Sequence, residues 1–191
     1  TWTYNFQTGN EVSELGHTNI RDSYIGSGSA DANHGSDSLI VGTDCEGVNT
    51  ECRMILALDN SQIPLPSQAN VHSASVKLTV ESAPLGPVTL SVHRLITNSW
   101  SQSASSWNNS QVGIPWSAGG MSPGLEYEAK AISEITVLPG DTEVWLDIGH
   151  SGMLIHGDNA WIIIPNTNGS FSTFVEFYSS EEQTDDDYRP N

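Results

Sequence analysis

Short stretches in which apolar and polar residues alternate constrain the fold of this 191-residue chain more than any other feature. Residues 76–80 carry Val, Leu and Val at every second position, and residues 88–92 repeat the same pattern. A period of two residues is that of a β-strand with one buried face. No amphipathic helical stretch of useful length accompanies these runs. The sequence therefore predicts an all-β, antiparallel β-sandwich, jelly-roll-like, with eight to ten strands.

Turn-forming residues set the expected connections. The sequence Pro84-Leu85-Gly86-Pro87 predicts a tight turn between residues 76–80 and 88–92. The polar segment 8–35, with its short apolar island at Tyr24-Ile25, is expected to be loop-like. We expect further strands at residues 1–7, 38–42, 53–59, 127–137, 144–148, 160–164 and 171–178.

No internal repeat or linker divides the chain, so residues 1–191 are predicted to form one β-sandwich domain. The sequence ends at Tyr188-Arg189-Pro190-Asn191, where another strand would normally begin. The expectation is that the domain lacks its last strand, either because the polypeptide was cut there or because another chain supplies that strand.

The charge of the chain excludes two classes of partner. Twenty-three acidic and six basic residues give a formal net charge of −17. Such a surface repels nucleic-acid phosphates and anionic lipids. The longest apolar run, residues 161–164, is too short to insert into a membrane.

Cys45 and Cys52, the only cysteines, are separated by six residues. We predict a disulfide between them, which would place the protein in an oxidising compartment, extracellular or at the cell surface. Two free thiols are the alternative. The sequons at Asn108 and Asn168 would permit glycosylation there.

Three of the six tryptophans, Trp100, Trp107 and Trp116, lie among small polar residues between residues 92 and 120. A tryptophan buries roughly 150 to 250 Å² of mostly apolar surface, so these rings must contact something outside their own segment. In one interpretation they fold back over one end of the sandwich and complete its core. In the other, one or more of them binds a sugar ring, with Arg94 beside them for a hydroxyl or uronate group.

Clustered carboxylate and amide side chains suggest a cation site. Calcium takes six to eight oxygen ligands, which Gly-rich loops bearing Asp and Asn can supply. A solvated acidic loop is the alternative. The expected calcium ligands are Asp22, Asp31, Asn33 and Asp37, joined by Glu181 if the closing segment packs beside the first of these.

Catalytic motifs are missing from the sequence. It contains no HExxH, GxSxG or Walker-type motif, and its six histidines form no familiar zinc set. We therefore predict a protein that is not an enzyme.

Several short motifs together resemble the DNRLRE-type β-sandwich domains, which are related to carbohydrate-binding modules that include alginate binders. Two of these motifs are Arg53 to Asp59 followed by Ile63-Pro64, and Trp100 with Trp107-Asn108. The others are Asp22-Ser23-Tyr24-Ile25 with Asn33-His34-Gly35 and residues 39–42, residues 74–80 with 88–95 as the central hairpin, and residues 177–181 with Arg189-Pro190. The likeness spans nearly the whole chain. It departs from the pattern at Gln102, where an acidic residue is common, at His34, where tyrosine is usual, and at the missing strand after Pro190.

Two functions follow as hypotheses. The first is a non-catalytic extracellular module that binds polysaccharide or mediates adhesion, with a structural calcium ion. The second is a subunit of an extracellular filament or surface layer, assembled by donation of the strand at residues 1–7 into a neighbouring copy. The donated strand would present Trp2, Tyr4 and Phe6 on one face. The expected partners are accordingly polysaccharide or copies of the same chain, within a larger multidomain or polymeric surface protein.

Overall fold

A computed structural model describes residues 20–59, 73–97, 99–149, 158–166, 173–180 and 190. Several predictions therefore lie outside the described residues, namely the strand at 1–7 with Trp2, Tyr4 and Phe6, the calcium ligand Glu181, and the sequon at Asn168. Within the described ranges, no helix is long and apolar enough to cross a membrane.

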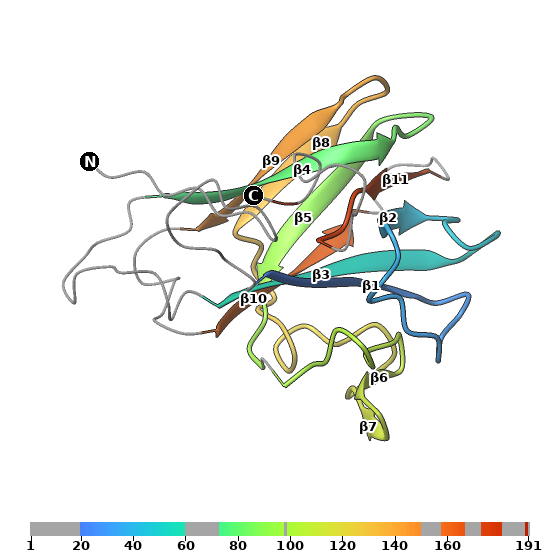
Figure 1. The fold of residues 1–191 in the computed structure, drawn as a ribbon, viewed down its shortest axis with the longest axis vertical. Coiled ribbons are helices and arrows are strands. Elements are labelled where there is room, and N and C mark those ends of the chain that lie inside the picture. The colour runs from blue at the N-terminus through green and yellow to red at the C-terminus, as the bar shows by residue number, and fades with distance from the viewer. Residues whose placement is uncertain are drawn as a thin grey trace.

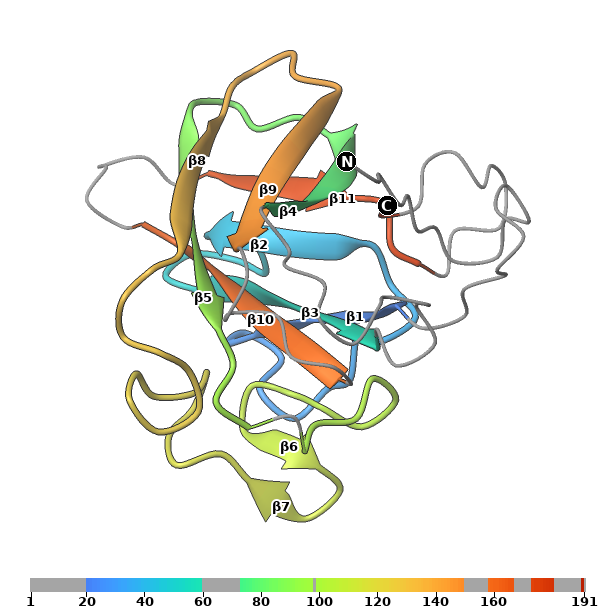
Figure 2. The same cartoon turned by 90° about the vertical axis from the view of Figure 1, so that its left-hand side faces the viewer.

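Antiparallel strands dominate the structure, and nine of them form one continuous hydrogen-bonded system folded into two layers (Figures 1 and 2). The first layer has the order β1-β3-β10-β5-β8 and the second β2-β11-β4-β9, and β2 joins them by pairing with the start of β3. This arrangement confirms the predicted all-β sandwich. The strands are β1 (Ile20–Gly26), β2 (Leu39–Thr43), β3 (Glu51–Asp59), β4 (Ala74–Ser82), β5 (Val88–Arg94), β8 (Ser133–Val137), β9 (Glu143–Gly149), β10 (Asp158–Pro165) and β11 (Phe174–Phe177), with a separate short pair β6 (Asn109–Gln111) and β7 (Ile114–Pro115).

The main hydrophobic core lies between the two layers. Alternate side chains of each strand point into it, as Val144, Leu146 and Ile148 do from β9. Trp161 and Phe177 are the largest side chains that it buries fully. Burying each large aliphatic side chain contributes about 1.5 to 3 kcal/mol, so this layered core is the main source of stability.

The expected hairpin of β4 and β5 is wrong, although both strands exist. β4 pairs with β9 and β11, whereas β5 pairs with β10 and β8. The connection through Pro84 and Gly86 therefore crosses from one layer to the other. Both strands send alternate apolar side chains into the same core from opposite sides, and alternation alone does not specify a strand's partner.

Two other strand predictions need correction. β1 lies within the segment that was expected to be loop-like. The sequence pattern did not reveal this strand, because two of its central residues, Asp22 and Ser23, are polar yet fully buried. The Asp22 carboxylate accepts hydrogen bonds from the Ser180 N–H, at 2.7 Å, and hydroxyl, at 3.0 Å. The strand expected at 127–137 is confined to β8.

Candidate functional site

The long connection between β5 and β8 covers the outer face of the first layer (Figures 1 and 2). It forms a second core there with outward-facing residues of β1, β3 and β10, such as Ile25, Ile55 and Ile162. The sequence predicted that this connection folds over one end of the sandwich. It lies instead on a sheet face, because that face is itself apolar and needs a cover.

Trp100 and Trp116 belong to this second core, with exposed fractions of 3% and 6%. The Trp116 Nε1 donates a hydrogen bond to the Ser106 carbonyl at 2.9 Å. A ring that is buried on both faces offers no surface to a sugar. For these two residues the structure supports the packing interpretation and not the predicted role in sugar binding.

Trp107 is half-buried and packs against the same core. The backbone of Gly119 and Gly120 lies so close to its ring that an added Cβ at either position would come within 2.6 Å of it. The guanidinium carbon of Arg53 lies 5.1 Å from the ring centroid. Trp107 therefore has little free face for a ligand.

Arg94 does not join the tryptophans as predicted. Arg21 lies over Trp100, at 5.1 Å from guanidinium carbon to ring centroid, and Arg53 lies over Trp107. Arg94 is half-buried at the end of β5. It follows Val92 by two residues and so shares the inner face of that strand, whereas the tryptophans cover the outer face.

Glu126 fixes the shape of the tryptophan-bearing connection. Its buried carboxylate accepts the Ser117 N–H and hydroxyl, both at 2.7 Å, and the Ser122 N–H at 2.8 Å. Burial favours the neutral acid, but these hydrogen bonds stabilise the carboxylate and together lower the pKa of Glu126 below its ordinary value.

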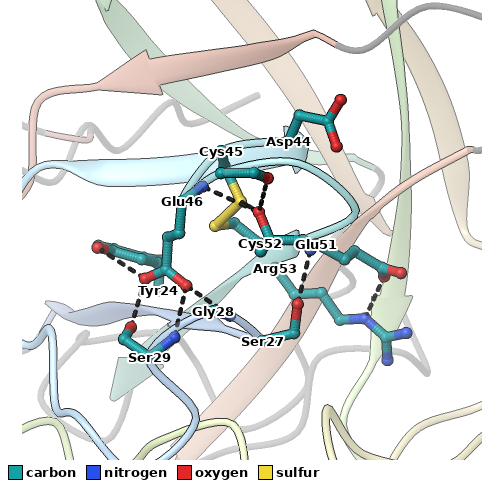
Figure 3. Close-up of a disulfide and its surroundings, with 12 residues drawn as sticks. Tyr24, Ser27, Gly28, Ser29, Asp44, Cys45, Glu46, Glu51, Cys52 and Arg53 are labelled. Atoms are coloured by element: carbon teal, nitrogen blue, oxygen red, sulfur yellow. Dashed lines mark hydrogen bonds and ion pairs between the residues drawn. A yellow bond between two sulfur atoms is a disulfide. The ribbon is translucent and has the colours of Figure 1, made fainter.

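The predicted disulfide between Cys45 and Cys52 is confirmed, and its loop contacts the β1–β2 connection (Figure 3). The Glu46 carboxylate accepts the backbone N–H groups of Gly28 and Ser29, both at 2.9 Å, and also the Ser29 hydroxyl. Glu46 thus attaches one loop to the other beside the disulfide.

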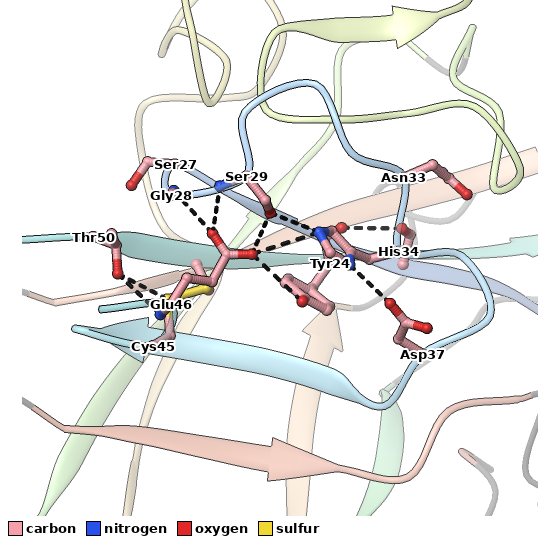
Figure 4. Close-up of polar contacts among 12 residues, drawn as sticks. Tyr24, Ser27, Gly28, Ser29, Asn33, His34, Asp37, Cys45, Glu46 and Thr50 are labelled. Carbon is pink, nitrogen blue, oxygen red and sulfur yellow. Dashed lines mark hydrogen bonds and ion pairs between the residues drawn. A yellow bond between two sulfur atoms is a disulfide. The ribbon is translucent and has the colours of Figure 1, made fainter. Parts of the chain in front are cut away.

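His34 lies at the centre of these contacts (Figure 4). Its ring stacks on Tyr24 with centroids 4.0 Å apart, and its Nδ1 lies 2.8 Å from an Asp37 carboxylate oxygen. Burial, and after it the negative charges of Glu46 and Asp37, raise the pKa of the Tyr24 hydroxyl. The Ser29 hydroxyl, which donates to the Glu46 carboxylate, also lies 2.8 Å from the His34 Nε2, so this cluster joins β1, the connection that follows it and the disulfide loop.

The described members of the expected calcium set have separate partners. The Asp22–Ser180 contact does place the closing segment beside β1, as that prediction required. The other three lie in the β1–β2 connection, where Asp31 accepts from Asn108, Asn33 donates to the carbonyls of Gln102 and Ser105, and Asp37 contacts His34. In the described part of the chain, no three His, Cys, Asp or Glu side chains are grouped so that they could hold a metal ion.

A different aromatic residue is open to solvent. Trp145, on β9, is 54% exposed, and of the large apolar side chains exposed by the described residues it alone is aromatic. It lies opposite Lys77 of β4 on the outer face of the second layer. Ser75 faces Asp147 and Thr79 faces Glu143 on either side of that pair. An exposed indole on an antiparallel strand pair, surrounded by polar groups, is suited to binding a sugar chain.

Sequence reasoning missed this residue, although a signal for it was present. In β9 the apolar side chains at 144, 146 and 148 alternate with Glu143, Trp145 and Asp147. Trp145 therefore occupies a solvent-facing position, where its indole has no packing role in the core.

Comparison with protein families decides the assignment. The family model of carbohydrate-binding module family 96 matches residues 14–113, just over half of the chain. The chain belongs to carbohydrate-binding module family 96. A search of curated proteins found no match.

Membership of family 96 accounts for several features together. Carbohydrate-binding modules are non-catalytic, in keeping with a sequence that has no catalytic motif. The β-sandwich and the disulfide suit such a module. Lys77 lies within the matched range, whereas Trp145, opposite it on β9, lies beyond that range.

Proposed function

We propose that this family 96 module binds polysaccharide on the outer face of β4 and β9, with Trp145 as the platform on which a sugar ring stacks. The observation that carries the proposal is the 54% exposure of Trp145 on a sheet face in a chain of a carbohydrate-binding family. Aromatic side chains supply large, flat apolar contact areas and dominate the energetics of binding surfaces.

The neighbours of Trp145 supply hydrogen bonds for sugar hydroxyls. Lys77, Ser75 and Thr79 supply donors from β4, and Glu143 and Asp147 supply acceptors from β9. Binding here requires no bond to be made or broken. We propose further that the protein acts outside the cell or at its surface, where polysaccharides and disulfides both occur.

Affinity electrophoresis tests the proposal. The protein is run in native gels containing a panel of soluble polysaccharides, and binding to the best of them is measured by calorimetry. We expect retardation by at least one polysaccharide and at least a tenfold loss of affinity in W145A. The control is L85A, which changes a side chain that is 97% exposed on the β4–β5 connection. If none of the polysaccharides retards the wild type, the proposed function is refuted.

The finer predictions made from the resemblance remain predictions. A relationship to the DNRLRE-type domains, a role in adhesion and an alginate ligand each need their own test. The filament hypothesis depends on residues 1–7 and on what pairs with the chain beyond Pro190, neither of which belongs to the described structure.

A further inference from the structure

We infer that the Trp145 face selects uncharged polysaccharide chains and discriminates against polyuronates. This inference rests on the proposed function, because it concerns the ligand of the same site. It runs against the alginate ligand that the family resemblance implies.

The charges around Trp145 are the first step. Glu143 and Asp147 lie two residues before and after it on β9, and both are exposed. Side chains two residues apart on a strand share one face at a spacing of about 7 Å. Both carboxylates therefore lie next to any sugar ring that stacks on the indole. Directly across the strand pair is Lys77.

The acidity continues across the second layer. Glu81 follows Lys77 and Thr79 on the outward positions of β4, and Glu176 occupies an outward position of β11. Burial, and after it the charge of Glu81, raise the pKa of Glu176, so these two carboxylates already repel each other. Among the described side chains of this face, Lys77 is the only basic one against four carboxylates.

These charges oppose a polyanion. Every ring of a polyuronate carries a carboxylate, so a chain lying over Trp145 brings negative charge beside Glu143 and Asp147. Two like charges about 7 Å apart in a water-like dielectric weaken binding about threefold. The two flanking carboxylates together therefore cost about tenfold, and the attraction of Lys77 recovers about threefold of that, so the side chains next to Trp145 leave a net cost of about threefold.

An uncharged sugar chain meets no such repulsion. Its hydroxyl groups donate to Glu143 and Asp147, and carboxylates accept stronger hydrogen bonds than neutral oxygens do. Lys77 donates to a ring or hydroxyl oxygen in the same chain. The side chains that repel a uronate thus serve as acceptors for a neutral polymer.

The test compares neutral polymers with alginate in affinity gels that contain EDTA, at 20 mM and 500 mM NaCl. The neutral polymers are hydroxyethyl cellulose, galactomannan and laminarin. We expect the wild type to bind one of them at least about threefold more tightly than alginate at low salt. The ratio of the two affinities should be smaller at high salt, because salt screens the repulsion.

Two double variants locate the cause of any selectivity. E143Q/D147N should lower the ratio of neutral-polymer affinity to alginate affinity, because it should improve the binding of alginate. D31N/E128Q makes the same change in net charge at exposed residues on the side covered by the tryptophan-bearing connection, and should leave the ratio unchanged.

Three results would overturn the inference. Alginate bound in EDTA as tightly as the best neutral polymer would do so, and so would an unchanged ratio in E143Q/D147N. In both of these cases the proposed function would stand. Retardation by no polymer at all would refute the proposed function and this inference with it.

Discussion

Removing the Cys45–Cys52 disulfide should measurably destabilise the module. The two cysteines are seven residues apart, and for a loop of this size the chain-entropy model gives about 2.4 kcal/mol at 25 °C. In a domain of this length each kcal/mol shifts the melting temperature by about 2 to 4 °C. We therefore expect C45S to melt about 5 to 10 °C below the wild type. Cys45 is the better position to change, because Cys52 is fully buried and a serine there would add a buried hydroxyl.

Urea unfolding followed by tryptophan fluorescence measures the effect directly. The wild type, the wild type with reductant, and C45S are compared, and C45S with reductant shows whether the reductant acts elsewhere. Reduced wild type and C45S should agree. A difference of less than about 1 kcal/mol between oxidised wild type and C45S, with the bridge verified by mass spectrometry, would refute the reasoning.

A double-mutant cycle with E46Q separates two mechanisms. If the bridge acts only by restricting the unfolded chain, the effects of C45S and E46Q should add. If it also holds Glu46 against Gly28 and Ser29, the double variant should lose at least about 0.5 kcal/mol less than the sum. The sign of the coupling then shows whether the disulfide loop and the β1–β2 connection form one unit.

The remaining predictions concern the tryptophan-bearing connection and calcium. G120A and G113A both place alanine at a left-handed φ, +76° and +72°, but of the two only Gly120 would bring the new Cβ against the Trp107 ring. Thermal unfolding should show G120A less stable than G113A by about 1 to 3 kcal/mol. Equal losses of stability in the two variants would contradict the packing described. Glu126 has a lowered pKa in the folded state, so its stabilisation of the fold is present above its ordinary pKa of 4.5 and is lost as the pH falls through the lower folded value. The difference in unfolding free energy between wild type and E126Q should be about 1 to 3 kcal/mol at pH 7 and should vanish in acid. A difference that is independent of pH would count against this account. For the calcium prediction, 10 mM calcium should stabilise the protein relative to EDTA by about 1.4 to 2.7 kcal/mol if the dissociation constant is that of extracellular modules, and an unchanged melting temperature would exclude the site.

The pattern of apolar residues was enough to place most of the strands. Strands β4, β5 and β9 fall where the period of two predicts them, and β2, β3, β10 and β11 fall at the short, largely apolar runs that were expected to be strands. The partners of these strands were beyond reach, because β4 and β5 have the same pattern whether they pair with each other or face each other across the core. β1 escaped detection because Asp22 is buried by a hydrogen-bonded partner, Ser180, that is 158 residues away in the sequence.

The candidate site was likewise only partly predictable from the sequence. Composition drew attention to the tryptophans of the β5–β8 connection, but composition does not show which apolar surface a ring covers. Trp100 and Trp116 are buried in the second core, which leaves their rings no free face. The exposure of Trp145 followed from strand periodicity alone. A tryptophan out of phase with its apolar neighbours therefore indicates an exposed ring better than a tryptophan-rich loop does.

The crossing between layers at the β4–β5 connection also bears on how the protein can be divided. The part of the chain that the family match covers ends at residue 113, yet β2, β3, β4 and β5 all take partners from β8 to β11, which come later. A fragment cut at that boundary would expose the apolar sides of four strands and their unpaired edges to water. The sandwich should therefore be expressed and should unfold as a whole, because β8 to β11, which lie beyond the matched residues, complete both of its layers.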